Sequence, residues 1–399
     1  MNTRATKGLA IASGSVLTRR YHTWLVPSQS KNGRQYTVDL SSDPPTCTCR
    51  DYADWQRECK HIFAAQYAVR RESGETLPEP EQTRQQTYRQ EWHEYNLAAT
   101  HEKSRFLELL FELCKGIDEP VQTFGRPRLS LADMLFCIVY KVYATISSRR
   151  FASDLRDALQ KGFISQAPHF NSVLNYLDDE RLTSLLRELI TQSAMPLKAV
   201  EQDFAVDSSG FSTCHFVRWY SEKYGNGQKD AHDWLKLHAM VGVTTHVITS
   251  VEISDRDSHD TNYFKPLVTN TASRFNLREV SGDKAYANRA NLKLVESVGA
   301  KPYITFRSNT RGDSTCATWN RIFHYYSLHR EEYMRHYHKR SNSESAFSMV
   351  KARFGERLRS KTKTAQVNEV LCKVLAHNLC CVIQSIYELG SEPTFWNEA

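Results

Sequence analysis

The sequence contains no uninterrupted run of about 18 apolar residues, which is the length that a membrane-spanning helix needs. Near the N-terminus only the short segment LAIA is apolar, too short for the central region of a signal peptide. We therefore expect neither a transmembrane helix nor a signal peptide, and no partner membrane.

Internal repeats, low-complexity segments and a compact disulfide framework are also absent. The ten cysteines are scattered along 399 residues, and this length predicts two or three domains. Four residues nevertheless have the spacing of metal ligands: Cys47, Cys49, Cys59 and His61. Such a pattern is typical of a reducing, cytoplasmic environment.

Positive charge is concentrated in one segment. The whole chain carries a net charge of +7, whereas residues 301–363 contain fourteen Lys or Arg and five Asp or Glu, so 14 − 5 = +9. A localised basic surface is typical of a phosphate-binding face. A solvated basic helix and loop would give the same count.

The N-terminal third predicts a small module followed by helices. In residues 1–70, YHTWLVPS and RQYTVDLS flank Lys-Asn-Gly and predict a β-hairpin, with a helix from about Lys60 to Arg70. Residues 71–100 are polar, with closely spaced prolines, and predict a linker that is helical toward its end. Helical periodicity then predicts an all-helical region over residues 101–198, with helices near 102–115, 130–146, 150–161, 169–178 and 180–194.

Residues 199–390 predict a mixed α/β domain, and residues 391–399 a tail. Three strands come first, with a turn near Thr244 and Thr245, and helices and strands then alternate. The last helix spans about 365–389 and is stopped by Gly390 and Pro393.

Four functional side chains follow one another near the C-terminus: Tyr337, Arg340, Glu344 and Lys351. Their spacings of three, four and seven residues predict that all four lie on one face of an α-helix. One acid among groups that bind phosphate suggests a metal ligand beside a nucleic-acid backbone.

Two further acids follow apolar runs, where the ligand sites of α/β sheets gather. Asp207 follows Phe204-Ala205-Val206, and Asp283 follows Val280-Ser281-Gly282. Either aspartate alone could be a turn former. Together with Glu344 they supply the oxygen ligands that two Mg²⁺ ions require for phosphoryl transfer.

The blocks AVDSSGF, SGDKAYAN and YHKRSNSESAFSMVK resemble the three acidic blocks of insertion-sequence DDE transposases, over about residues 101–390. The third block matches the Tyr-x2-Arg-x3-Glu-x6-Lys signature at every position. The resemblance implies an RNase H-like mixed sheet flanked by helices, preceded by a helical DNA-binding region. It implies that Asp207, Asp283 and Glu344 are catalytic and bind two Mg²⁺ (or Mn²⁺) ions, and that Tyr337, Arg340 and Lys351 bind DNA.

Further expectations follow from the resemblance. The partners would be the double-stranded DNA of transposon ends and target, and a second copy in a homodimer. The protein would act in a prokaryotic cytoplasm, on the nucleoid when bound. Only 61 positions separate Asp283 from Glu344 (344 − 283), which leaves room for one helix, one strand and a loop rather than a β-rich insertion.

Three cysteines and a histidine in the pattern Cys-x-Cys-x9-Cys-x-His are suited to one closed, tetrahedral zinc site. A unit this small requires such an ion in order to fold. With the preceding strands and Trp24, the pattern resembles the SWIM zinc finger over about residues 20–70. The resemblance implies a ββα module that binds DNA or protein.

Other polar residues have two open interpretations each. Lys236 and His238 alternate on a strand and either face the site or lie at a sheet edge. An aromatic and basic group either contacts DNA or packs in the core: Trp219, Tyr220, Lys223 and Tyr224. Lys361 and Lys363, which follow Arg353, Arg357 and Arg359, are candidate phosphate contacts.

The sequence as a whole thus predicts a DNA transposase that cleaves transposon ends and transfers the strands to a target. Two alternatives remain open. One is a transposase-derived DNA-binding protein that has lost catalysis, against which the presence of all three acids argues. The other is a metal-dependent nuclease without strand transfer.

Overall fold

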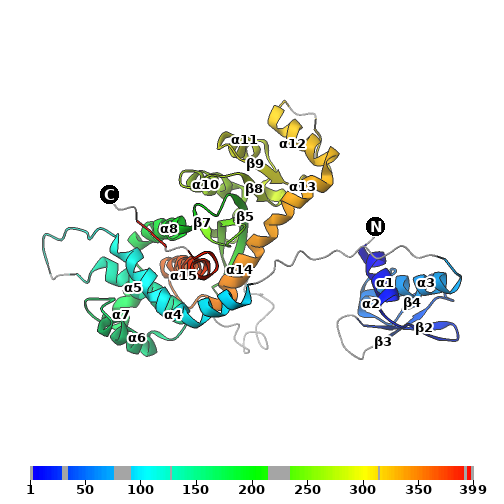
Figure 1. Ribbon diagram of the computed structural model, residues 1–399, viewed down its shortest axis with the longest axis horizontal. Helices are drawn as coiled ribbons and strands as arrows, with labels where there is room; N and C mark the ends of the chain where they lie inside the picture. The colour runs from blue at the N-terminus through cyan, green and yellow to red at the C-terminus, as the bar shows by residue number, and fades with distance from the viewer. Residues whose placement is uncertain are drawn as a thin grey trace, which may run out of the picture. The chain divides into compact units, whose positions relative to one another are not determined.

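The computed structural model describes residues 3–28, 35–75, 91–125, 128–213, 234–312, 315–390 and 393–396. The chain divides into two compact units, Met1–Arg89 and Gln90–Ala399. Figure 1 labels most of their helices and strands. Because the expected aromatic group at residues 219–224 falls in a gap, Trp219, Tyr220, Lys223 and Tyr224 lie outside the described residues.

The first unit is a four-stranded sheet with helices. Its strands pair antiparallel in the order β1-β2-β3-β4, and the hairpin predicted around Lys-Asn-Gly is formed by β2 and β3. Trp24 and Val26 of β2 and Val38 of β3 point into the core. The elements are α1 (Thr3–Gly14), β1 (Thr18–Arg20), β2 (Thr23–Pro27), β3 (Gln35–Asp39), β4 (Thr46–Cys47), α2 (Arg50–Trp55) and α3 (Lys60–Glu72). Helix α1 and strand β1 were not predicted.

The second unit begins with the predicted helices. They are α4 (Trp92–Lys115), α5 (Leu131–Ala144), α6 (Ser148–Gln160), α7 (Phe170–Leu177), α8 (Arg181–Ala194) and the 3-10 turn η1 (Met195–Leu197). Helix α5 begins after Ser130, whose hydroxyl accepts a hydrogen bond from the amide of Asp133. Helix α4 begins inside the segment predicted as a linker, which agrees with the expected helical end of that segment.

A five-stranded mixed sheet follows, in the order β7-β6-β5-β8-β9. Strands β5, β6 and β7 are antiparallel neighbours, whereas β8 and β9 run parallel to β5. The strands are β5 (Asp203–Ser212), β6 (Trp234–Gly242), β7 (Ile248–Asp255), β8 (Glu279–Gly282) and β9 (Lys301–Ile304). The predicted fold class is confirmed: an RNase H-like mixed sheet with flanking helices, after a helical region and a small module that carries a Cys/His group.

Helices cover both faces of this sheet (Figure 1). Helix α10 packs on β6 and β7, and α11 packs on β9, whereas α14 lies along β5 and β6. The remaining elements are α10 (Thr261–Ala272), η2 (Lys284–Tyr286), α11 (Arg289–Ser297), α12 (Ala317–Leu328), α13 (Arg330–Tyr337), η3 (His338–Arg340), α14 (Ser341–Phe354) and α15 (Lys363–Leu389).

Helix α15 lies at the centre of the second unit and packs on α4, α5 and α8 as well as on β7. The helical region and the sheet therefore share one hydrophobic core, and the domain boundary predicted at residue 198 stays a prediction. Among the described helices, only α15 is both long enough and apolar enough to cross a membrane. However, 83% of its most apolar 18-residue stretch is buried inside the protein. A core helix has the same properties.

Candidate active site and metal centre

Two aspartates are brought together by the parallel pairing of β5 and β8. The last pair in register is Val206 with Gly282. Asp207 and Asp283 are the residues that follow this pair on the two neighbouring segments of the chain. Asp283 keeps an extended backbone, and its Oδ1 accepts a hydrogen bond from the amide of Ala285, 2.7 Å away. The two carboxylates consequently lie side by side where the parallel pairing ends.

Asp207 lies inside a strand, whereas the sequence predicted it at a strand end. Strand β5 continues to Ser212 because it remains paired with β6 after β8 has diverged. The pKa of Asp207 is raised, chiefly by burial and additionally by the negative charge of Asp283. A partly desolvated pair of carboxylates favours a bound cation.

Three groups contact the Asp207 carboxylate. Its Oδ1 accepts from the amide of Ser208 at 2.9 Å, and its Oδ2 accepts from the Ser343 hydroxyl at 2.9 Å. The guanidinium of Arg340 donates through Nη1 to Oδ2, also at 2.9 Å. Ser343 is fully buried beside Glu344 and was not identified from the sequence, although it follows Arg340 by three residues on the same helical turn.

Glu344 reaches the site through Arg340. Nη2 of this arginine lies 2.6 Å from Oε1 of Glu344. One guanidinium therefore joins Asp207, on β5, to Glu344, on α14. The Glu344 side chain is 62% exposed, whereas those of Asp207 and Arg340 are 18% and 20% exposed. The helical acid therefore lies at the solvent side of the site.

The predicted single helical face is wrong in one respect. The four signature residues are distributed over α13, η3 and α14, with Tyr337 ending α13 and only Glu344 and Lys351 within α14. A 3-10 turn rotates each residue further about the axis than an α-helix does, which changes the direction of residues before it relative to those after it. The expected i,i+4 contact between Arg340 and Glu344 is present.

Tyr337 precedes Arg340 and Glu344 on the series of helices α13, η3 and α14, and Lys351 follows them. Tyr337 is half-buried against the core, with the Arg340 guanidinium 6.0 Å from its ring centre. Lys351 lies 3.2 Å from Glu356 and 5.6 Å from the ring centre of Phe211, a residue on the same face of β5 as Asp207. Arg340 and Lys351 thus both contact residues of β5.

The carboxylates have the donor chemistry that Mg²⁺ prefers, since all are hard oxygen ligands. Asp207, Asp283 and Glu344 would hold the ions. Among the described residues, only the cysteine and histidine group has its ligand atoms gathered within 4.8 Å of one another, so the three acids form a less compact set. Arg340 occupies oxygens of two of them.

Tyr286 lies beneath this site and was also missed by sequence reasoning. Its side chain is 1% exposed, and burial, followed by the carboxylates of Asp260, Asp207 and Asp283, raises its pKa. Its hydroxyl makes no hydrogen bond to a carboxylate of the described residues. Gly282 makes room for the ring, because an added Cβ would lie 3.2 Å from Cδ2 of Tyr286.

Both interpretations of Lys236 and His238 are wrong. Strand β6 lies inside the sheet, and His238 pairs in register with Ser208, so its side chain is on the face opposite Asp207. Lys236 lies 2.6 Å from Asp260, and His238 is buried, stacked on Tyr263. Burial lowers the pKa of His238 to about 4.

The basic residues after the signature divide into two groups. Arg353 pairs with Glu102, Arg359 donates to the carbonyl of Thr145, and Lys363 lies 2.6 Å from Asp255. Arg357 and Lys361 are exposed, and no side-chain ion pair joins either of them to another described residue. Of the two candidate phosphate contacts, Lys361 is therefore the more available, and Arg357 near it is available as well.

The segment between Asp283 and Glu344 contains more helix than expected. One helix, one strand and a loop were predicted, but α11, β9, α12 and α13 all lie there. Helices α12 and α13 are rich in Tyr and His, and the sequence predicted a loop where they lie. Strand β9 is the only strand in the described part of this segment, which agrees with the absence of a β-rich insertion.

In the first unit, four buried side chains converge: Cys47, Cys49, Cys59 and His61. Cys47 ends β4, while Cys49 and Cys59 precede α2 and α3. Nδ1 of His61 lies 4.0 Å from Sγ of Cys47 and 3.8 Å from Sγ of Cys59. Three free thiols and an imidazole make a donor set that fits a closed zinc site.

Part of the chain is similar to a known protein family. Residues 198–379, a little under half of the chain, match the family described as a transposase DDE domain. This match supports a DDE transposase, and the segment contains Asp207, Asp283 and Glu344.

One curated relative is a probable transposase for insertion sequence element ISA1214 from Archaeoglobus fulgidus, 24% identical over 185 residues. The alignment covers 46% of this chain and 55% of the relative, so the chain spans about half the length of that protein. No solved structure matches.

Proposed function

We propose that the protein is the DNA transposase of an insertion sequence, which binds the ends of its element, cleaves a phosphodiester there and transfers the strand to target DNA. The observation that carries the proposal is the position of Asp207 and Asp283, each directly after its member of the Val206 and Gly282 pair. Glu344 is linked to Asp207 through Arg340. The match of residues 198–379 to a transposase DDE domain supports it.

The three acids would hold two Mg²⁺ or Mn²⁺ ions, which supply the Lewis acid for in-line attack on a phosphodiester. Asp207 and Asp283 are fixed by the sheet, so they provide a rigid half of the site. Glu344, on the helix, completes it from the solvent side. The protein's own contribution is positioning and stabilisation of charge.

Tyr337, Arg340 and Lys351 are assigned to the DNA end. All three lie along the α13, η3 and α14 path, and Arg357 and Lys361 extend the cationic surface beyond it. Arginine and lysine contacts to phosphate orient the duplex without reading its sequence. The helical region, residues 101–198, is assigned to DNA binding as well.

The first unit is assigned one structural zinc ion at Cys47, Cys49, Cys59 and His61, as in a SWIM zinc finger. The convergence of these four ligand atoms within 4.8 Å supports the assignment. Its partner is DNA or protein. A homodimer on double-stranded DNA is the expected working form, because two transposon ends must be joined.

The decisive experiment compares Asp283→Asn with the wild type on duplexes taken from the DNA that flanks the gene. Cleavage should fall about a thousandfold, because several kcal/mol of charge stabilisation is lost, while duplex binding is retained. Asp257→Asn is the matched control, since Asp257 is an 87% exposed loop residue. Cleavage that survives in Asp283→Asn would contradict the metal assignment.

Two alternatives are separated by the same substrates. A transposase-derived DNA-binding protein would bind the duplex and cleave nothing in the wild type. A nuclease without strand transfer would cleave the intact duplex but fail to join pre-cut ends to a target. The transposase joins pre-cut ends in the presence of Mg²⁺ or Mn²⁺.

A further inference from the structure

A second acidic pair lies on β5 and β8, at the strand starts. Asp203 pairs in register with Glu279 at the first position of the parallel ladder. Asp207 and Asp283 follow its last position. The side chains of Asp203 and Glu279 are 8% and 10% exposed. Two carboxylates this close and this buried repel each other unless cations compensate them.

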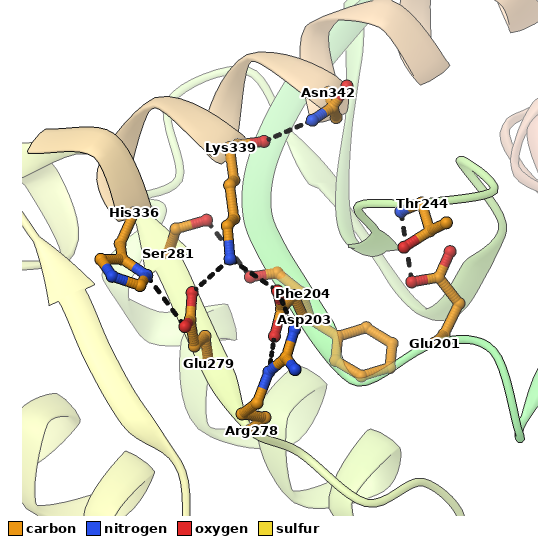
Figure 2. Close-up of polar contacts among 10 residues, drawn as sticks. All are labelled: Glu201, Asp203, Phe204, Thr244, Arg278, Glu279, Ser281, His336, Lys339 and Asn342. Carbon is orange, nitrogen blue, oxygen red and sulfur yellow. Dashed lines mark hydrogen bonds and ion pairs between the residues drawn. The ribbon is translucent and has the colours of Figure 1, made fainter. Parts of the chain in front are cut away.

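Two cationic side chains, Lys339 and Arg278, and the imidazole of His336 surround this pair (Figure 2). Nζ of Lys339 lies 2.7 Å from Oδ2 of Asp203 and 2.8 Å from Oε2 of Glu279. Arg278 donates to both oxygens of Asp203 at 2.7 Å, and Nδ1 of His336 lies 2.9 Å from Oε1 of Glu279. Lys339 alone touches both acids.

Lys339 is held strongly by these contacts. Burial alone would lower its pKa, but the hydrogen bonds to Asp203 and Glu279 outweigh burial and raise it. For Asp203, burial raises the pKa, and the hydrogen bonds from Arg278 and Lys339 more than reverse that effect. Charge-assisted bonds of this length are among the stronger hydrogen bonds in proteins.

The position of Lys339 in the chain gives these contacts a consequence for the candidate active site. Lys339 and Arg340 are consecutive residues of η3, and their partners Asp203 and Asp207 are four residues apart on β5 and so face the same side. The 3-10 turn is therefore fixed to one strand at two points. Helix α14, with Glu344, begins at the very next residue, Ser341.

We propose that Lys339 is a positioning residue of the acid site, which sets where α14 starts and hence where Glu344 stands relative to Asp207 and Asp283. Lys339 touches none of the three acids and acts through the backbone of η3. This role rests on the proposed function, because it assigns a metal-binding task to Glu344.

The test uses the full zinc-loaded chain and Mn²⁺ alone as the probe, with the affinity measured from the electron paramagnetic resonance signal of free Mn²⁺. Lys339→Met keeps the length of the side chain and removes its charge. We expect it to weaken Mn²⁺ binding about tenfold, the lower end of what outer residues contribute to metal sites. Lys339→Arg, which can still reach both carboxylates, should restore binding.

Lys293→Met is the matched control, since Lys293 is an exposed residue of α11, and it should bind Mn²⁺ as the wild type does. Urea unfolding of each variant measures the folded fraction. If Lys339→Met is folded and binds Mn²⁺ as tightly as the wild type, the positioning role is overturned. If it does not fold, Glu279→Gln, which removes one of the two anchors of Lys339, decides, and unchanged Mn²⁺ binding there overturns it.

Failure of the proposed function gives a different result. In that case the wild type and Asp283→Asn bind Mn²⁺ equally, or neither binds it. Hydrogen exchange of residues 341–354 then tests the positioning independently of metal. Faster exchange in Lys339→Met than in Lys293→Met supports it, and equal exchange overturns it.

Discussion

Nη1 of Arg340 lies 2.9 Å from Oδ2 of Asp207, although 133 residues separate the two in the chain. The same guanidinium holds Glu344 through Nη2. The arginine assigned to DNA phosphate thus engages two acids assigned to metal. When DNA and metal bind, a phosphate group would replace the two acids as the partner of Arg340, and two metal ions would replace Arg340 as the partner of the acids.

This arrangement predicts that DNA and metal binding are coupled. A duplex that draws Arg340 to its phosphates frees carboxylate oxygens, so it should raise the affinity for Mn²⁺ about tenfold, and the coupling is reciprocal. In Arg340→Ala the Mn²⁺ affinity should be almost independent of DNA. Titration of Mn²⁺ with and without duplex measures this, with exposed Arg274→Ala as the control. Equal coupling in Arg340→Ala and the wild type would refute the exchange.

The zinc assignment predicts a metal content. The purified full chain should contain one zinc ion per molecule, and Cys59→Ser should lose it because three ligands do not close a structural site. Elemental analysis by mass spectrometry measures the content. Cys114→Ala, at a buried cysteine of α4, should keep its zinc. Equal zinc in Cys59→Ser and the wild type would remove the basis for a SWIM-type module.

Tyr333 is predicted to be the main anchor of α13 on the sheet. Its buried hydroxyl accepts from the amide of Ile304 at 2.9 Å and donates to the Ile304 carbonyl, on edge strand β9. Tyr333→Phe leaves buried backbone groups unpaired, so the free energy of unfolding should fall by about 1–3 kcal/mol. Urea denaturation measures the change, and half-buried Tyr326→Phe on α12 should have little effect. A loss of stability no larger than that of the control would refute the anchor.

Two buried histidines predict a loss of stability in acid. Burial lowers the pKa values of His238 and His377 from 6.5 to about 4, so both stay neutral in the folded protein while the unfolded chain takes up protons below pH 6.5. Stability therefore decreases as the pH falls from 6.5 to about 4. Each histidine should contribute about 2 kcal/mol between about pH 7 and about pH 5.

Urea unfolding at several pH values tests this dependence. His377→Gln should remove the contribution of His377, about 2 kcal/mol between about pH 7 and about pH 5. His93→Gln, at an exposed position of α4, should leave the slope as it is. A slope unchanged in His377→Gln would contradict the assignment of His377 as a neutral buried group.

Much of the fold follows from local patterns. The predicted helices near 130–146 and 180–194 correspond to α5 and α8, and the turn near Thr244 joins β6 to β7. Periodicity of apolar residues carries this information within a few turns of chain. Helices α12 and α13 were missed because each has a single buried residue, Ile322 and Tyr333, so neither shows a repeated apolar face.

Long-range partners could not be predicted in the same way. The pairing of Lys339 with Asp203 and Glu279 depends on the register of two strands and on the turn η3, none of which has a local signature. His238 was wrongly placed for a related reason. Alternation along a strand gives two faces but does not say which one carries the site.

The sequence by itself determined which residues are proposed for the two sites: three acids in order, a signature of spaced cations and a tyrosine, and four zinc-type ligands. These are properties of residue type and spacing, which need no folded chain. The tertiary structure alone decided how they meet, because the register of β5 with β8 sets Asp207 beside Asp283 and Arg340 joins Asp207 to Glu344. Distances between segments more than a hundred residues apart depend on packing, which only the complete fold specifies.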